Sequence, residues 1–274
     1  MTTLNRRVLP GFSLSLGYSV CYLGLLVFIP LAACFLKAAS LSATQFWDAV
    51  WNERTRAAYT LTFGASLAAA FANAVLGLLV AWVLVRYSFP LKRLFDALVD
   101  LPFALPTAVA GLVYSSLYVR SGWLGQYLVP LGIEGAYSRL GIVLVLIFTG
   151  FPFVVRTVQP VLEGLEPELE EAASTLGANR WQTFRLVLWP PLIPPLLTGF
   201  ALAFARALGE YGSVVFIAGN KPFQTEIAPV LIVARLEEFA YGEATALAVV
   251  LLVMSFILLG AINLLERWSK SRAA

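Results

Sequence analysis

Long apolar runs without a charged residue dominate this chain and restrict its fold more than any other feature. A helix that spans a bilayer needs about 20 mostly apolar residues. Six segments meet this requirement, at residues 13–36, 57–85, 99–119, 140–159, 192–218 and 244–265. Lipid offers backbone groups no hydrogen-bond partner, so such segments adopt helices. We therefore predict an all-α integral membrane protein with six spans.

Composition excludes an ordinary soluble domain. Of the 274 residues, 59% are hydrophobic and 13% are charged, whereas soluble domains carry about 25% charged residues. The net charge of +3 is small and does not indicate a nucleic-acid partner. The first apolar run resembles a signal peptide, but its uncharged stretch at residues 8–36 exceeds the signal core of about 7–15 residues. We expect it to remain as a membrane helix.

The placement of basic residues predicts the orientation in the membrane. With the N-terminus in the cytoplasm, eleven Lys and Arg residues fall on inner segments and seven fall on outer ones, while Arg206 lies within a span. Basic residues are enriched on the cytoplasmic side of membrane proteins. Both termini and the polar loop at residues 160–191 are therefore expected in the cytoplasm.

Catalytic signatures are scarce. The chain has no histidine, which excludes His-based metalloproteases and Ser-His proteases. The phosphate-binding pattern G-x-x-x-x-G-K-[ST] is also absent. Cys21 and Cys34 would lie about 20 Å apart along one helix, too far for a disulfide or a metal pair. We predict no catalytic or metal-binding residue, and transport is the simplest function. A membrane enzyme is the less favoured alternative.

The polar loop has the pattern of two short helices. Its acidic residues are Glu163, Glu166, Glu168, Glu170 and Glu171. Pro167 is expected to begin a helix that runs to Leu176, and Gly177 to supply the left-handed turn that ends it. A second helix would carry Trp181 and Phe184 until Pro190 stops or bends it. A charge run is often only a solvated connection, but exposed aromatic residues beside charges favour a docking surface.

The fifth span contains a charge pair. Arg206 and Glu210 have the i,i+4 spacing that places side chains on one helix face. Charges within a span are costly and usually face protein or a water-filled path. Three interpretations remain open: a structural ion pair, a gate or path element, and snorkelling to the interface. Gly209 and Gly212 suit close helix packing or a point of flexion.

The third span is predicted to bend. Its sequence L-P-F-A-L-P-T-A-V-A-G-L covers residues 101–112. Pro102 and Pro106 lack the backbone N–H group and would free carbonyls toward the protein interior. Thr107, directly after the second proline, adds a small polar group there. Interhelical hydrogen bonding is the ordinary role of such groups in membranes.

The segment that starts at Glu171 resembles the EAA motif of ABC importer permeases, which reads E-A-A, three residues, G, nine residues, I, one residue, L-P. The residues that match in register are Glu171, Ala172, Ala173, Gly177 and Pro190. Val187 and Trp189 stand at the Ile and Leu positions. The resemblance implies a six-helix type I ABC importer transmembrane domain whose cytoplasmic coupling helix seats in a groove of an ATPase. The implied coupling residues are Glu171, Ala172, Ala173, Gly177, Trp181 and Phe184.

Neither an internal repeat nor a low-complexity linker divides the chain. We therefore expect one membrane domain. The resemblance implies an N-terminal span with the first external loop at residues 1–56 and a transmembrane core at residues 57–265. The coupling loop at residues 163–190 would lie within this core.

A second resemblance concerns the substrate. The run R-A-L-G-E-Y-G at residues 206–212 is similar to a run in permeases for tetrahedral oxyanions, including sulfate and molybdate. Residues 206–220, 101–112 and 122–125 together most resemble the T-type permeases of sulfate/thiosulfate importers. The implied gate or translocation-path residues are Arg206, Glu210, Gly209 and Thr107. Molybdate or tungstate as the substrate, and a secondary transporter without an ATPase, remain alternatives.

The resemblance also implies a set of partners. These are a homologous second permease subunit, two copies of an ATPase subunit that bind ATP and Mg, and a periplasmic sulfate-binding protein. No cofactor is expected on this chain itself. The implied location is the plasma (inner) membrane of a bacterium, with several spans and both termini cytoplasmic.

Overall fold

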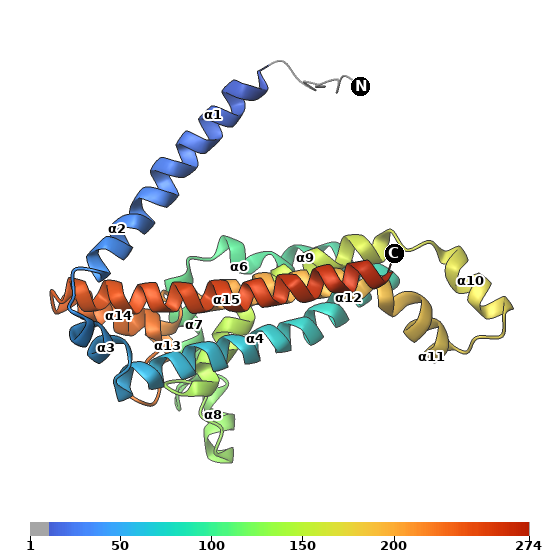
Figure 1. The fold of residues 1–274 in the computed structure, drawn as a ribbon. Coiled ribbons are helices and arrows are strands. Elements are labelled where there is room, and N and C mark those ends of the chain that lie inside the picture. The colour runs from blue at the N-terminus through green and yellow to red at the C-terminus, as the bar shows by residue number, and fades with distance from the viewer. Residues whose placement is uncertain (1–10, 274) are drawn as a thin grey trace, which may run out of the picture.

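The structure is a computed structural model that describes residues 11–273, with side chains described through residue 265. Every regular element in this part of the chain is a helix, which confirms the predicted all-α fold. Four long helices lie side by side in a bundle (Figure 1). They are α4 (Glu53–Arg86), α9 (Arg139–Glu163), α12 (Trp189–Leu208) and α15 (Tyr241–Ala273).

The core of the bundle lies between α4, α9 and α12. Val154 and Val158 of α9 are fully buried, and they share one apolar cluster with Ala70 of α4 and with Leu192 and Phe204 of α12. In lipid, the hydrophobic effect does not drive helices together. Small residues let the helices approach closely, so van der Waals contacts hold them together instead. α4 and α9 start at the same end of the bundle, and α12 runs in the opposite direction.

Side-chain caps fix where the two parallel helices begin. The side chain of Asn52 accepts a hydrogen bond from the Thr55 amide at 2.8 Å, at the start of α4. The Ser138 hydroxyl accepts one from the Gly141 amide at 3.1 Å, at the start of α9. Each cap satisfies an N–H group that the first helical turn leaves free.

Shorter helices gather at the two ends of the bundle (Figure 1). One end, here called the α14 end, carries α3 (Ala43–Val50), α13 (Val214–Ile217) and α14 (Ala228–Glu237). The opposite end, here called the α10 end, carries α10 (Pro167–Thr175) and α11 (Arg180–Thr183), which project beyond the bundle. Between the long helices the chain also forms α5 (Lys92–Val99), α6 (Leu101–Ala104), α7 (Thr107–Tyr118), α8 (Gly125–Leu128) and a 3-10 turn (Val129–Leu131).

Five helices are long and apolar enough to cross a membrane within the described residues: Phe12–Ala38, Glu53–Arg86, Arg139–Glu163, Arg180–Leu208 and Tyr241–Leu265. The predicted count of six is not confirmed, because the expected third span is interrupted. Its residues divide into α6 and α7, with extended backbone at Leu105 and Pro106. The expected bend is confirmed, and its cause is the proline that cannot continue the hydrogen-bonded ladder of α6.

The first span projects away from the bundle (Figure 1). It comprises α1 (Phe12–Leu23), a π-helical turn (Gly24–Phe28) and α2 (Ile29–Ala38), and none of its most apolar window is buried in this chain. Only α2, near its end, packs against α15. Cys21 and Cys34 are both free, and Cys21 is exposed on the surface of this chain.

Five of the basic residues that predict the orientation have no described side chain. Arg6 and Arg7 lie outside the described residues, as do the side chains of Arg267, Lys270 and Arg272.

The fifth span ends earlier than predicted. α12 ends at Leu208 rather than near residue 218, and helix resumes only at Val214 as α13. Between them the Glu210 carboxylate accepts a hydrogen bond from the Ser213 amide at 3.0 Å. A side chain that bonds a nearby amide competes with the helical ladder, which explains the break.

Candidate functional site

The loop with the acidic run folds as the sequence predicts. α10 begins at Pro167 and ends at Thr175, and Gly177 has a φ angle of 82°. The Gly177 amide donates to the Ser174 carbonyl and the Ala178 amide donates to the Ala173 carbonyl, both at 3.0 Å. These two bonds form a Schellman motif, in which glycine supplies the left-handed residue.

The surface of this loop is mostly open. Glu171 and Ala172 are exposed, whereas Ala173 is buried against the chain. Trp181 of α11 has 67% of its surface exposed. Phe184 is only half-buried rather than exposed, because its ring packs in T-shaped contact with Trp82 of α4 at 5.8 Å between centroids. The expected exposure is thus found for Trp181 and not for Phe184.

Pro190 does not stop the second helix. A π-helical turn (Phe184–Leu188) joins α11 to α12, so the helix continues from Arg180 to Leu208. The wider turn relieves the clash that a proline ring makes with the carbonyl four residues earlier. It also brings Phe184 and Trp189, five residues apart, to 5.9 Å between ring centroids.

An ion pair joins the loop to the bundle. Arg86, the last residue of α4, places Nη1 2.5 Å from Oε1 of Glu170 in α10. Its guanidinium also lies over the Trp82 ring, 5.4 Å from the centroid. Because both charged groups are partly buried, screening by solvent is weaker than on an open surface. The ion pair and the aromatic contacts therefore hold α10 and the π-helical turn against the end of α4.

A second charged cluster ties α5 to α9 near the same end. Arg156 of α9 donates to Asp100 at 2.9 and 2.6 Å, and to Asp96 at 2.6 Å. The hydrogen bonds from Arg156 hold the pKa of Asp100 below its usual value. The stabilisation that ionised Asp100 gives the folded chain is therefore complete at neutral pH. It is lost only as the pH falls through this lowered pKa.

The charge pair of the fifth span forms, but not on one helix face. Arg206 lies in the last turn of α12 and Glu210 lies beyond the helix end, where the two side chains meet as an ion pair. Glu210 Oε1 also accepts hydrogen bonds from the Ser213 amide at 3.0 Å and hydroxyl at 2.8 Å. The Glu210 side chain is 1% exposed, whereas 35% of the Arg206 side chain remains exposed.

The position of the pair along the long helices indicates its depth in the membrane. A Cβ atom on Gly150 of α9 would lie 2.5 Å from the Asn73 side chain of α4 and 3.3 Å from Cβ of Ala203 in α12. Because α12 runs opposite to α4, Arg206 lies about level with Ala70, which is about 25 Å from either end of α4 at 1.5 Å per residue. A charged side chain at the centre of a bilayer costs about 2.5–3.5 kcal/mol on insertion scales. Non-helical backbone at that depth occurs only where protein or a water-filled cavity surrounds it.

Two breaks in the helices meet at this point. A Cβ atom on Gly212 would lie 2.3 Å from the hydroxyl oxygen of Thr107, the first residue of α7. Glycine is therefore required there for the close approach. Gly209 faces open space and carries no such requirement. The structure thus brings Arg206, Glu210 and Thr107 to one region, and it limits the predicted packing role to Gly212.

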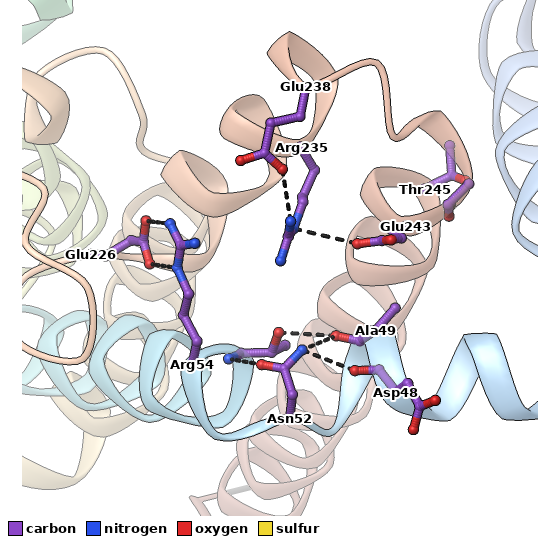
Figure 2. Close-up of polar contacts among 11 residues, drawn as sticks. Asp48, Ala49, Asn52, Arg54, Glu226, Arg235, Glu238, Glu243 and Thr245 are labelled. Atoms are coloured by element: carbon purple, nitrogen blue, oxygen red, sulfur yellow. Dashed lines mark hydrogen bonds and ion pairs between the residues drawn. The ribbon is translucent and has the colours of Figure 1, made fainter.

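Ion pairs within this chain hold the elements of the α14 end together (Figure 2). Arg54 of α4 forms a two-pronged pair with Glu226 in the loop before α14, with both N–O distances at 2.7 Å. Arg235 of α14 lies 2.7 Å from Glu238 and 3.5 Å from Glu243 of α15. Paired forks of this kind restrain both partners in orientation.

Several aromatic side chains in the segments at this end are exposed. They are Trp47 and Trp51 at α3, and Phe223 and Phe239 in the loops on either side of α14. Aromatic residues are enriched where proteins dock. The α14 end therefore combines a restrained backbone with exposed aromatic side chains.

Sequence reasoning missed the partners that give these sites their geometry. Trp82 and Arg86 carried no motif, Glu226 lay in a loop, and Ser213 stood within the run at residues 206–220 without an assigned role. Arg86 directly follows an apolar span and Glu170 lies in a charge run, so a search for unpaired charges at helix ends could have suggested their contact. The Ser213 contact needs the break after Leu208, which the apolar pattern did not indicate.

Comparison with protein families identifies the class of this chain. Residues 73–271 match the family described as binding-protein-dependent transport system inner membrane component. The "Sulfate transport system permease protein CysT" of Salmonella typhimurium is 52% identical over 262 residues, which cover 96% of this chain and 95% of that protein. The protein of the same name from Synechocystis is 53% identical over 255 residues, covering 93% and 89%.

Solved structures share the fold. A crystal structure of a bacterial ABC transporter that imports alginate superposes with a TM-score of 0.74 at 18% identity, covering 93% of this chain and 94% of that one. A further structure shows the alginate transporter in complex with a periplasmic protein bound to alginate pentasaccharide, with a TM-score of 0.73 at 19% identity and 93% of each chain covered. The MetNI methionine transporter gives 0.58 at 20% identity, over 85% of this chain and 100% of that one.

These likenesses agree with each other and with the described helices. Five apolar helices and a family of transport components make this a multi-pass inner membrane protein. The chain therefore belongs to the binding-protein-dependent transport system inner membrane components, as a transport permease with the type I ABC importer fold and not as an enzyme.

Proposed function

We propose that this chain is one of two permease subunits of an ATP-driven importer and forms half of the translocation path for sulfate or thiosulfate. The observation that supports this choice of substrate is the identity of 51–53% to sulfate permeases of three bacteria over at least 93% of this chain. The core at residues 57–265 forms the path, and residues 1–56 add the first span and external loop.

The α10 end is the proposed contact with the ATPase. Glu171, Ala172 and Gly177 are exposed on a rigid helix–turn unit, and Trp181 extends that surface. Ala173 and Phe184 support the unit from within, since both pack toward the chain. A helix that transmits force to a bundle has to be rigid and firmly attached. The loop at residues 163–190 meets both conditions through its Schellman motif and the Arg86–Glu170 pair.

The proposed path passes Arg206, Glu210, Gly209 and Thr107. Support comes from the charge pair at mid-membrane and from the non-helical backbone beside it. If lipid alone surrounded these polar groups, they would have no hydrogen-bond partners. We infer that the exposed side of Arg206 faces the second permease or the water-filled path between the two subunits.

The remaining partners follow from the two ends of the bundle. A homologous permease completes the path, and two ATPase subunits bind ATP and Mg below the α10 end. This chain carries no cofactor. A periplasmic sulfate-binding protein docks on the aromatic surface of the α14 end, which places both chain termini in the cytoplasm.

Uptake of labelled sulfate tests the proposal. Cells that lack this chain, in a background without other sulfate uptake, are expected to lose sulfate accumulation and regain it when the chain is supplied. Excess thiosulfate is expected to compete more strongly than molybdate. Unchanged sulfate uptake after deletion would contradict the proposed substrate.

Molybdate or tungstate is the second candidate, because they are also tetrahedral oxyanions. Uptake that the chain restores for molybdate but not for sulfate would favour it. Uptake that persists without any ATPase partner would instead indicate a secondary transporter.

A further inference from the structure

Arg206 faces two environments at once. On one side its guanidinium meets the carboxylate of Glu210, which is almost fully buried. On the other side about a third of the side chain stays open, three residues along α12 from Ala203, which lies against the middle of the bundle. Among the described residues, Glu210 is the acidic group within ion-pair distance of this guanidinium.

The open side of the guanidinium needs acceptors. A guanidinium carries five N–H donors in a planar fork, and Glu210 contacts only part of it. Acyl chains accept no hydrogen bond, so exposure of these donors to lipid is unfavourable. The open side is therefore suited to water or to an anion that passes along the path.

We propose that Arg206 binds the oxyanion during transport and that the Glu210 carboxylate is a built-in placeholder that occupies the guanidinium between two passing anions. This proposal rests on the proposed function above, because it assigns the anion contact within that path. Glu210 meets the guanidinium through Oε2 alone, which leaves part of the fork for a tetrahedral oxyanion, whose oxygens accept hydrogen bonds from arginine as a carboxylate does.

Ser213 makes this exchange reversible. Arg206 contacts Oε2 of Glu210, whereas the Ser213 amide and hydroxyl both donate to Oε1. When Arg206 turns to the anion, these two bonds hold the carboxylate in place. Ser213, which is fully buried, is thus a positioning residue that keeps Glu210 ready to take the guanidinium back.

The negative charge of Glu210 also limits how tightly the anion binds. Conduction requires a site that is favourable enough to enter and weak enough to leave. An unpaired arginine at low dielectric would hold a dianion strongly. The neighbouring carboxylate repels the dianion and competes for the fork, so the anion is released.

Retention of labelled sulfate by the whole transporter tests this exchange. The complex of this chain with its co-expressed partners is solubilised and equilibrated with radiolabelled sulfate, without ATP and without binding protein. Glu210→Gln removes the charge, but its amide oxygen can still accept both Ser213 bonds. We expect this variant to retain at least tenfold more sulfate than wild type, and the double variant Arg206→Gln/Glu210→Gln to lose the gain.

A matched control comes from the other buried acid. Glu226 is also almost fully buried and also pairs with an arginine, Arg54, but it lies at the α14 end. Glu226→Gln is expected to retain no more sulfate than wild type. An equal gain in this control, or no gain in an assembled Glu210→Gln complex, would overturn the proposal.

A second variant covers the case in which Glu210→Gln fails to assemble. Arg206→Lys keeps the positive charge beside Glu210 and leaves the two Ser213 bonds to Glu210 untouched, but it removes the guanidinium fork. Assembly with sulfate uptake reduced at least tenfold supports the anion contact, whereas uptake at the wild-type rate refutes it. Failure of the proposed function is recognised separately, because sulfate uptake would then not depend on this chain at all.

Discussion

The charged residues that stand out at the two ends of the bundle differ in whether this chain pairs them. At the α14 end, Arg54 and Arg235 are each paired with glutamates (Figure 2). At the α10 end, Glu170 pairs with Arg86, while Glu171 is exposed and has no ion pair among the described residues. The first two arginines therefore restrain the backbone, whereas Glu171 is presented outward.

This difference separates two roles for similar residues. A charge that is already paired restrains the backbone, and its loss changes stability first. A charge that is left open is available to another molecule, and its loss changes activity first. Substitutions at the two ends should therefore produce different phenotypes, which makes the comparison testable.

The largest effect is expected from the turn at the α10 end. Gly177→Asp should abolish sulfate uptake, because φ is 82° there and an added side chain would stand on the proposed ATPase surface. The measurement is sulfate uptake in cells with matched amounts of the variant and wild-type protein in the membrane. Ala178→Asp, at the next position, is the control for added charge alone. Wild-type uptake in the glycine variant would remove the coupling role.

Glu171→Lys is expected to be nearly as severe, because it reverses a charge on the same open surface. Glu168→Lys gives a matched control, since Glu168 is another exposed acid of α10. Equal uptake in the two variants would show that position 171 has no special contact. Both proteins should insert normally into the membrane.

A loss of more than tenfold in uptake is expected for Arg206→Ala, because it leaves the buried Glu210 carboxylate without its cation. Arg235→Ala at the α14 end should lose less than about fivefold, because partly exposed pairs contribute about 0–1 kcal/mol and 1 kcal/mol is about fivefold. Similar losses in both variants would show that depth in the membrane does not distinguish these arginines.

A loss of about tenfold is expected for Arg86→Glu, since one charged hydrogen-bond partner is worth about 1.5 kcal/mol. The exchange Arg86→Glu/Glu170→Arg should recover most of the uptake, because it restores the pair in reverse. ATP hydrolysed per sulfate transported is the second readout, and it should rise in the single variant. An unrecovered double variant would contradict an attachment through this pair.

The smallest effect on transport is expected for Glu226→Gln. It weakens the fork to Arg54, so thermal unfolding of the solubilised complex should shift down by a few degrees. Sulfate uptake at the growth temperature should stay within about twofold of wild type, a change of less than 0.5 kcal/mol. A large loss of uptake without a shift in unfolding would mean that the α14 end is more than a restraint.

Sequence patterns predicted the local features of this molecule well. The apolar runs located α4, α9 and α15 within a few residues at most of their described ends, except that α15 continues beyond the expected span at residue 265. Pro167 and Gly177 bound α10 as expected, because helix start and stop signals act within a few residues. The EAA resemblance also agrees with the family that the comparisons show.

Contacts between distant residues were beyond that reach. Arg86 and Glu170 are far apart in sequence, and they meet because α4 and α9 run in parallel and end together. The break after Leu208 depends on a hydrogen bond from Ser213 to Glu210, which apolar periodicity cannot reveal. Hydropathy measures suitability for lipid, whereas these contacts depend on which faces meet in the folded chain.

The π-helical turn between α11 and α12 determines the angle at which α11 lies about the axis of α12. One extra residue is accommodated in that turn, and each residue of an α-helix advances the chain by about 100°. Removing a residue from Phe184–Leu188 would let the turn rewind as an ordinary helix, with α11 rotated by about that angle about the axis of α12. Phe184 would then turn away from Trp82 although every other residue of the loop is unchanged. The chain thus encodes the direction in which the proposed ATPase surface points, and not only its distance from the bundle.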